Sequence, residues 1–427
     1  MTPGGDAGRR LSRRRLLEIG GGFAAGAAIG GGAAGASARD DDVAQNAEAS
    51  YPFDGPHEQA GITTPRQRHL ALAAFTLDDG LHGAFGRGEL AGLMQDWSTA
   101  ARALAAGQAL PEGLGSSAGL GAPADTGEAD GLGPSGLTIT FGFGPEVFGT
   151  ERDLVRAADR PGRLETLPRF AGDALEPRWS GGDLLVAASA DDAQVAVHAI
   201  RNLARMARGA AGLHWLQRGF LPETAKAGEA PRNLMGFRDG QSMLDHRDQV
   251  SAGKFLWSGS DAPAWMRGGG TQLVVRRIRM QLEAWDTATL EHQEATVGRS
   301  KGDGVFLPGT AAGRGDDYDG SAVDPDGRGA EGSHATVARD AATATGQILR
   351  RPYSYADGVV EETGQLDAGL IFLAFQRSIP DQFIPMQERI ARLDAMNEYT
   401  SPIGSAVFAV PPASRGPKDW VGSGLLG

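Results

Sequence analysis

Apolar positions along the chain follow two different periods, and the period changes from one segment to the next. In the first half, alternating or continuous apolar runs at 69–75, 137–144 and 183–190 predict β-strands. Between these runs, apolar residues at helical spacing in 89–106 and 192–208 predict amphipathic helices. The first half therefore alternates strands with helices.

The second half repeats this arrangement. Residues 271–282 alternate from Val275 onward and predict a strand, and the apolar runs 369–376 and 404–411 predict two more. Residues 381–396 read as the last helix. Because strands and helices interleave twice with long connections, the pattern predicts an α+β protein built from two modules of similar construction.

Composition changes set the predicted limits of these parts. Two stretches rich in Gly and Asp, 111–136 and 298–332, predict long loops. The second loop lacks the Glu at position twelve that an EF-hand needs, so its aspartates predict a solvated loop rather than a calcium site. The predicted parts are a leader (1–38), a linker (39–61), an N-terminal module (62–225), a C-terminal module (226–412) and a tail (413–427).

The first residues have the layout of an export signal. Residues 12–17, with Arg13 and Arg14 as the central pair, fit the twin-arginine pattern, and 36–38 form an A-x-A cleavage site. The eight glycines from Gly20 to Gly35 contribute too little apolar area for a membrane anchor. The sequence thus predicts a leader that is removed, and export of an already folded protein to the periplasm, cell envelope or exterior.

The amino-acid composition excludes several classes of partner and of catalytic or metal site. A chain of 427 residues with 41% hydrophobic and 22% charged residues is typical of a soluble globular protein. The net charge of −12 argues against a nucleic-acid partner, which needs a basic surface. With no cysteine, the chain can form no disulfide, no thiolate nucleophile, no Cys-ligated zinc or iron–sulfur cluster and no haem attached through a C-x-x-C-H motif. Only eight histidines remain as candidate imidazole ligands.

One short motif joins apolar residues to a charged pair. Gly236 and Phe237 precede Arg238, Asp239 and Gly240 in the sequence GFRDG. Asp-Gly is a strong hairpin signal, so a plain surface turn is one interpretation. Glycines at both ends would also let the backbone lie close to a flat ligand, and this is the alternative interpretation.

Two other motifs in the sequence help to interpret GFRDG. GFRDG, the Ser333-His334 pair and ILRRPYSY at 348–355 together resemble the dye-decolourising haem peroxidases, and the leader favours the exported deferrochelatase/peroxidase branch. The likeness covers about residues 60–412. It implies a dimeric ferredoxin-like fold, with two four-stranded antiparallel sheets flanked by helices. It also implies a non-covalent haem b in the C-terminal half.

The resemblance assigns the site. His334 matches the iron ligand, Asp239 the distal acid–base residue and Arg350 the distal cation. A carboxylate can take a proton from one oxygen of hydrogen peroxide and deliver it to the other, and an arginine stabilises the negative charge that develops. The other residues expected to contact haem are Gly236, Phe237, Arg238 and Gly240.

Three choices stay open in the sequence. His246 competes with His334 as ligand, although it would then share the face of Asp239. Arg351 competes with Arg350, because neighbouring residues of a strand point to opposite faces. A carboxylate should accept the second N–H of the ligand histidine, and of Asp394 and Glu398 we favour Glu398. The chain also departs from the family pattern after GFRDG and after His334, which affects haem-edge contacts and substrate access.

These observations predict an exported haem b peroxidase that uses hydrogen peroxide to oxidise dyes, phenols or similar bulky reductants. The alternative is a haem-binding accessory of iron uptake, acting as a deferrochelatase or a ferrous-iron oxidase. The expected partners are hydrogen peroxide and a small-molecule reductant, with iron-transport proteins under the alternative. A homo-oligomer is the expected state.

Overall fold

The first half of the chain contributes four strands to one sheet, and the second half contributes five. The computed structural model describes residues 49–114, 122–162, 164–224, 230–238, 244–307 and 332–427, so the predicted leader lies outside the described residues. The strands are β1 (His69–Leu77), β2 (Thr138–Phe143), β3 (Leu184–Ala190), β4 (Ala211–Phe220), β5 (Thr271–Met280), β6 (Leu349–Arg350), β7 (Tyr353–Val359), β8 (Leu366–Gln376) and β9 (Thr400–Val410).

The helices fall between the strands. They are α2 (Gly83–Ala105), α3 (Ala193–Met206), α4 (Gln249–Phe255), α5 (Leu282–Thr287), α6 (Leu290–Val297), α7 (His334–Thr345), α8 (Ile384–Leu393) and α9 (Ser423–Leu426), with short turns η1 (Pro145–Phe148), η2 (Ala157–Asp159), η3 (Pro177–Trp179), η4 (Ala264–Met266), η5 (Ile379–Phe383) and η6 (Ala395–Glu398). Among the described helices, none combines the length and apolarity that a membrane crossing needs.

The sheet closes on itself. Its strand order is β5-β9-β2-β3-β1-β4-β7-β8-β6, and an added β5–β8 pairing turns eight of these strands into an antiparallel barrel. Within each half the pairings are long, but among the described residues the strands of the two halves pair with each other only at Phe143–Ala409 and Phe220–Ser354. The two sheets expected from the sequence are therefore joined edge to edge into one barrel.

Alternation along the strands builds two apolar cores. In β1, Leu70 and Leu72 belong to a cluster inside the barrel, whereas Ala73 and Phe75 belong to a cluster under the helices. Because successive side chains of a strand point to opposite faces, one strand serves both cores. Trp97 of α2 joins the outer cluster and donates its indole N–H to the carbonyl of Leu203 in α3 at 2.9 Å.

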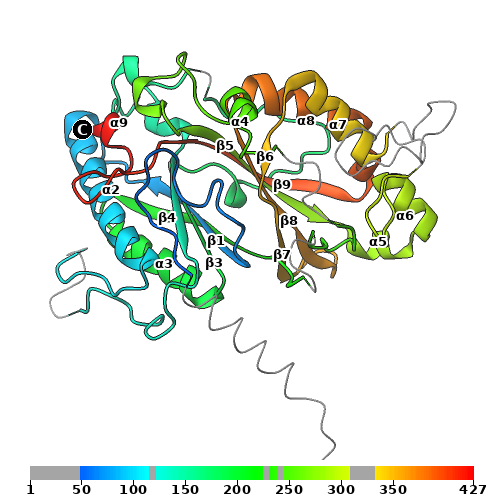
Figure 1. Cartoon of the computed structure of the whole chain (residues 1–427), viewed down its shortest axis with the longest axis horizontal. Helices are drawn as coiled ribbons and strands as arrows, with labels where there is room; N and C mark the ends of the chain where they lie inside the picture. The colour runs from blue at the N-terminus through cyan, green and yellow to red at the C-terminus, as the bar shows by residue number, and fades with distance from the viewer. Residues whose placement is uncertain (1–48, 115–121, 163, 225–229, 239–243, 308–331) are drawn as a thin grey trace, which may run out of the picture. The chain divides into compact units, whose positions relative to one another are not determined.

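The helices cover the outside of the barrel in two groups. Figure 1 shows α2 and α3 beside β1, β3 and β4, and α7 packed against α8. The second group brings the start of α7 next to the end of α8, which matters for the site described below.

Most predicted elements are confirmed with shifted ends, and several further elements, among them β4, β7 and α7, were missed. The strand predicted at 271–282 ends at Met280, because the chain turns at Gln281 into α5. β4, β7 and α7 were not predicted. β4 carries Gln217 and Gly219 at inward positions, which hides its alternation from a hydrophobicity pattern. α7 buries only Thr336, Val337 and Ala341, too narrow an apolar face to predict a helix.

The ends of the described region pack into the fold. Of the predicted linker, Phe53 and Gln59 are buried, and the backbone of Gly55 donates to Ser414. The tail reaches α2, where Arg87 donates to the carbonyls of Leu425 and Leu426 at 2.9 and 3.2 Å. The tail therefore docks on this chain itself.

Candidate functional site

His334 is the first residue of α7 and is oriented by a buried carboxylate. Its Nδ1 lies 2.6 Å from Oδ2 of Asp394, whose side chain is 1% exposed. Asp394 ends α8 and caps η6, with Oδ1 accepting from the backbone N–H of Met396 at 2.8 Å. With the proton held on Nδ1, the lone pair of Nε2 is the metal-binding one.

The partner of His334 corrects one expectation from the sequence. We favoured Glu398, but Asp394 makes the hydrogen bond and Glu398 is exposed at the end of η6. The two carboxylates are four residues apart in sequence, and only the turn between α8 and η6 decides which of them faces the imidazole.

The GFRDG motif is described up to Arg238; Asp239 and Gly240 lie outside the described residues. Gly236 has φ +85°, and an added Cβ would lie 2.6 Å from Cε of Lys301, so the position requires glycine. Phe237 is buried, with its ring centroid 6.0 Å from that of Trp285. The described glycine thus lies against a lysine of the protein, and the expected haem contacts of Gly236 and Phe237 stay predictions.

The two candidate arginines point to different places. Arg351 is buried and donates Nη1 to the carbonyls of Ile62 and Thr64 at 3.3 and 2.6 Å, so its side chain holds the loop before β1. Arg350 is half-buried at the end of β6, and its backbone pairs with Ala374 of β8. Adjacent strand residues face opposite sides, so the role of Arg351 leaves Arg350 on the other side.

A further arginine lies near Arg350. Burial, and then the charge of Arg350, lower the pKa of Arg299 to about 10. The guanidinium of Arg299 lies 3.5 Å from the ring centroid of Phe306 and donates to the carbonyl of Gly304 at 2.9 Å. Two cations close together, one of them partly desolvated, form a setting that an anionic group would stabilise.

Arg238 is another positively charged residue close to Asp303. A hydrogen bond from the backbone N–H of Val305 is the largest cause of the lowered pKa of Asp303. The positive charge of Arg238 lowers this pKa by a smaller amount. This places Arg238 near the loop 299–306 that carries Arg299.

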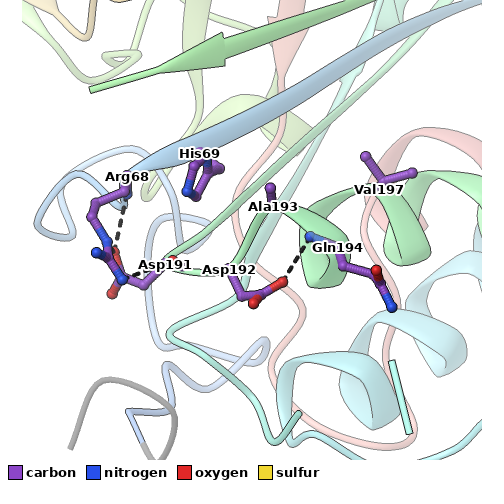
Figure 2. Close-up of a pocket in the computed structure, with 7 residues that line it drawn as sticks. All are labelled: Arg68, His69, Asp191, Asp192, Ala193, Gln194 and Val197. Carbon is purple, nitrogen blue, oxygen red and sulfur yellow. Dashed lines mark hydrogen bonds and ion pairs between the residues drawn. The ribbon is translucent and has the colours of Figure 1, made fainter. Parts of the chain in front are cut away.

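A shallow pocket lies elsewhere in the described part of the chain. Figure 2 shows it at the starts of β1 and α3, lined by Arg68, His69, Asp191, Asp192, Ala193, Gln194 and Val197. None of the residues predicted to bind haem lines it. Pocket shape by itself would therefore have directed attention away from His334.

Comparison with known proteins decides the family. The model for "Dyp-type peroxidase, N-terminal" matches residues 59–221, and that for "Dyp-type peroxidase, C-terminal" matches residues 230–415. The chain belongs to the Dyp-type peroxidase family. It is accordingly a haem peroxidase, an oxidoreductase that uses peroxide.

Relatives of this Dyp-type peroxidase cover nearly all of it. A deferrochelatase of Escherichia coli O157:H7 is 34% identical over 90% of this chain and 88% of its own. DtpA from Streptomyces lividans is 35% identical over 90% of this chain and 99% of its own, with a TM-score of 0.77. A DyP-type peroxidase from Cellulomonas bogoriensis is 34% identical over 89% and 99%, with a TM-score of 0.76.

The rival ligand His246 has weaker support in this Dyp-type peroxidase. It lies in the turn before α4, beside Asp245. Among the described residues no hydrogen bond orients its ring, whereas His334 has the carboxylate partner that metal-binding histidines usually have. The geometry favours His334.

Sequence reasoning assigned no role to Arg299 or Lys301. Their signal was present in GRSKGDG at 298–304, a segment that resembles the family. A loop rich in glycine and charge is common on protein surfaces, so without neighbours it could not be placed next to Arg350.

Proposed function

We propose that this enzyme binds a non-covalent haem b, whose iron Nε2 of His334 would hold. The donor set fits such a group, because the imidazole has its Nδ1 proton fixed by a buried carboxylate. Arg299 supplies positive charge that haem propionates would meet. When bound, the haem supplies the redox chemistry that couples reduction of peroxide to oxidation of a reductant.

The protein's own groups then handle protons and charge. Asp239 takes a proton from one oxygen of hydrogen peroxide and returns it to the other, while Arg350 stabilises the negative charge on the departing oxygen. Asp394 keeps His334 in one tautomer and orientation. Removal of the acid–base group or of the charge stabiliser costs on the order of 10²–10⁴ in rate.

The observation that carries this proposal is the His334–Asp394 hydrogen bond at the start of α7. The test is an absorption spectrum of haem-supplemented protein, recorded with and without peroxide, for wild type and His334→Ala. Wild type should show a Soret band that changes on adding peroxide, and His334→Ala should lose or shift that band. An unchanged spectrum in the variant would remove His334 as the ligand.

A second variant tests the distal group separately. Asp239→Asn should retain haem and its Soret band but lose the reaction with peroxide. Full dye oxidation by Asp239→Asn would remove Asp239 from the mechanism while leaving the ligand assignment intact.

The same substitution at Arg350 and at Arg351 tests the different roles of these two neighbours. Arg350→Leu should slow the reaction with peroxide while leaving the free energy of unfolding nearly unchanged. Arg351→Leu should lower the unfolding temperature instead, because it leaves the carbonyls of Ile62 and Thr64 without their donor. The reverse result would exchange the two roles.

A second candidate function is supported by the name of the curated relatives. The E. coli relative is named deferrochelatase, which fits a role in taking iron from haem for an iron-transport partner. Such an enzyme would release iron-free porphyrin when incubated with haem, and would oxidise dyes slowly. Porphyrin fluorescence after incubation, set against the rate of dye oxidation, separates the two functions.

The order of the strands also bears on the fold of each half. We infer that each half is a ferredoxin-like module, since the first half runs β1-α2-β2-β3-α3-β4 with spatial order β4-β1-β3-β2. In the second half, β5, β7, β8 and β9 follow the matching order β9-β5-β8-β7.

Export and assembly are also proposed. The leader pattern at 1–38 supports export by the twin-arginine route, and replacing both Arg13 and Arg14 by Lys should keep the protein in the cytoplasm. Cell fractionation measures this directly. A homo-oligomer is proposed on the resemblance alone, and light scattering of the purified enzyme tests it.

A further inference from the structure

A groove runs along the outer face of the barrel beside α3. The pocket of Figure 2 continues into a second hollow of about 200 Å³, because His69, Ala193 and Val197 line both. The second hollow also reaches Arg218 and Phe220 of β4. α3 packs against β1 and β3 and leaves these two side chains of β4 exposed. The groove therefore lies between the helix and the uncovered part of the sheet.

The strand register fixes the spacing of the polar side chains in this groove. His69 of β1 lies opposite Phe220 of β4, and Ala71 lies opposite Arg218. His69 and Arg218 are therefore diagonal neighbours across the two strands, a placement that separates residues by about 7–8 Å. Arg218 and Phe220 share the outer face of β4, because the residues that alternate with them are buried.

Three carboxylates line the groove, and each of them already has partners. Asp191 accepts from the backbone N–H of Arg68 at 3.0 Å and lies 3.9 Å from the guanidinium of the same residue. Asp192 caps α3 and accepts from two backbone N–H groups of its first turn. Asp357 forms an ion pair with Arg277 at 2.8 Å. These charges are therefore matched within the protein.

Two polar side chains of the groove have no such match. Within the described part of the chain, the guanidinium of Arg218 and the imidazole of His69 form no hydrogen bond and no ion pair. Burial, and then the charge of Arg68, lower the pKa of His69 below its ordinary 6.5, against smaller opposing effects of Asp192 and Asp191. At pH 7 the groove therefore presents one unmatched cation and one neutral imidazole that can accept a hydrogen bond.

We propose that this groove binds a single-ring phenolic carboxylate. The carboxylate pairs with Arg218, because a guanidinium fork matches the two carboxylate oxygens. The ring packs between Phe220 and Val197, and the hydroxyl at the opposite end of the ring donates to the imidazole of His69. A hollow of about 200 Å³ is smaller than the pockets that hold drug-sized ligands, so it suits a molecule with one ring.

The inference goes beyond the proposed function, because binding in this groove requires neither haem nor peroxide. None of the residues proposed to bind haem lines the groove. A ligand in the groove should therefore leave the Soret band of haem-loaded enzyme unchanged, whereas a ligand beside the iron should shift it. The groove can thus be tested separately from the peroxidase activity.

The experiment is calorimetric titration of haem-loaded enzyme with 4-hydroxybenzoate at pH 7, without peroxide. Wild type should bind this probe with a Kd on the order of 1 mM or tighter. Arg218→Leu should raise the Kd about 10–100-fold, because it removes a charge-assisted hydrogen bond. Arg208→Leu is the matched control, the same change at an exposed arginine beyond the far end of α3, and it should keep the wild-type Kd.

Two further probes assign each end of the ligand to its side chain. For 4-hydroxybenzyl alcohol, which has no carboxylate, Arg218→Leu should change the Kd by less than about twofold. His69→Leu should raise the Kd of 4-hydroxybenzoate about three- to tenfold, because one neutral hydrogen bond is lost. The same variant should bind benzoate, which has no hydroxyl, as wild type does.

Three results would overturn the inference. They are the absence of saturable binding up to about 10 mM probe, an equal Kd of 4-hydroxybenzoate in wild type and Arg218→Leu, and a shift of the Soret band on binding. The unfolding temperatures of the Arg218 and His69 variants should stay near that of wild type, since neither side chain bonds another described residue. Comparison of the probes within one variant keeps the test valid if a variant is less stable.

Discussion

At the scale of single residues, the carboxylate of Asp394 divides its two oxygens between two tasks. One accepts from the backbone N–H of Met396, and the other accepts from Nδ1 of His334. The first bond holds the carboxylate in place, so the second can fix the plane of the imidazole. A buried carboxylate in this position also makes the imidazole a stronger ligand.

The first prediction concerns this residue. Asp394→Asn should speed haem loss by about 10–100-fold, because a neutral amide no longer increases the basicity of the ligand. Transfer of haem to apomyoglobin measures the rate. The control is Glu398→Gln, four residues further on and exposed, which should lose haem at the wild-type rate. Equal rates in all three proteins would contradict the role of Asp394.

The second prediction concerns His69, which lines the pocket of Figure 2. Burial, and then the charge of Arg68, lower its pKa below the ordinary 6.5, against smaller opposing effects of Asp192 and Asp191. The unfolded chain therefore binds more protons than the native chain just below pH 6.5, so the free energy of unfolding falls as the pH drops through this range.

The test compares variants at two pH values. His69→Gln should lose less stability than wild type between pH 8 and pH 5, as measured by urea unfolding at each pH. His57→Gln, which replaces an exposed histidine, should follow wild type. If His69→Gln and wild type lose the same stability, the lowered pKa of His69 has no part in the pH dependence.

At the scale of elements, one of the two narrow joints of the barrel is the contact between β2 and β9, which pair through one residue each. Gln59 spans this joint. Its Nε2 donates to the carbonyls of Phe141 and Pro411 at 3.0 and 2.9 Å, and its Oε1 accepts from the N–H of Phe141 at 2.8 Å. A side-chain amide thus takes the place of backbone ladder bonds between the two halves.

The third prediction follows. Gln59→Ala should lower the free energy of unfolding by about 1–3 kcal/mol, because it leaves buried backbone groups without partners. Gln95→Ala, on the exposed face of α2, is the control and should change it by less than about 0.5 kcal/mol. Chemical denaturation gives both values. A loss for Gln59→Ala no larger than that of the control would mean that water replaces the amide at no cost.

At the scale of the whole molecule, the tail brings the end of the C-terminal half onto a helix of the N-terminal half. Val421, Leu425 and Leu426 are buried there, at 1%, 0% and 5% exposed. Arg102 of α2 adds an ion pair with Asp54 at 2.8 Å and a hydrogen bond to Ser414 at 2.7 Å. Both ends of the described region are therefore held against the same helix.

The fourth prediction tests this closure. Leu425→Ala should lower the free energy of unfolding by about 2–5 kcal/mol, the usual cost of emptying a buried leucine site. Leu290→Ala, with the same chemistry at a side chain 57% exposed, should cost less than about 1 kcal/mol. Thermal unfolding of the two variants gives the comparison, and equal values would mean that the tail is only loosely attached.

The sequence by itself determined the α+β class, most strands, the long helices α2 and α3, and the family. These features depend on local periodicity and on motifs whose residues lie close together in the chain. His334 was identified in this way, because Ser333-His334 and the later ILRR segment resemble motifs of the family. The alternation in β1 likewise needs no tertiary information, since successive side chains of a strand must face opposite sides.

The tertiary structure alone decided the features that depend on which distant residues meet. Asp394 rather than Glu398 reaches His334 because α7 packs beside the end of α8. Arg277 looked like any strand arginine, yet it is fully buried between Asp357 and Asp367, at 2.8 and 3.1 Å. A charge can be buried only where the fold brings its partners to it, and partners 80 and 90 residues away leave no trace in local periodicity.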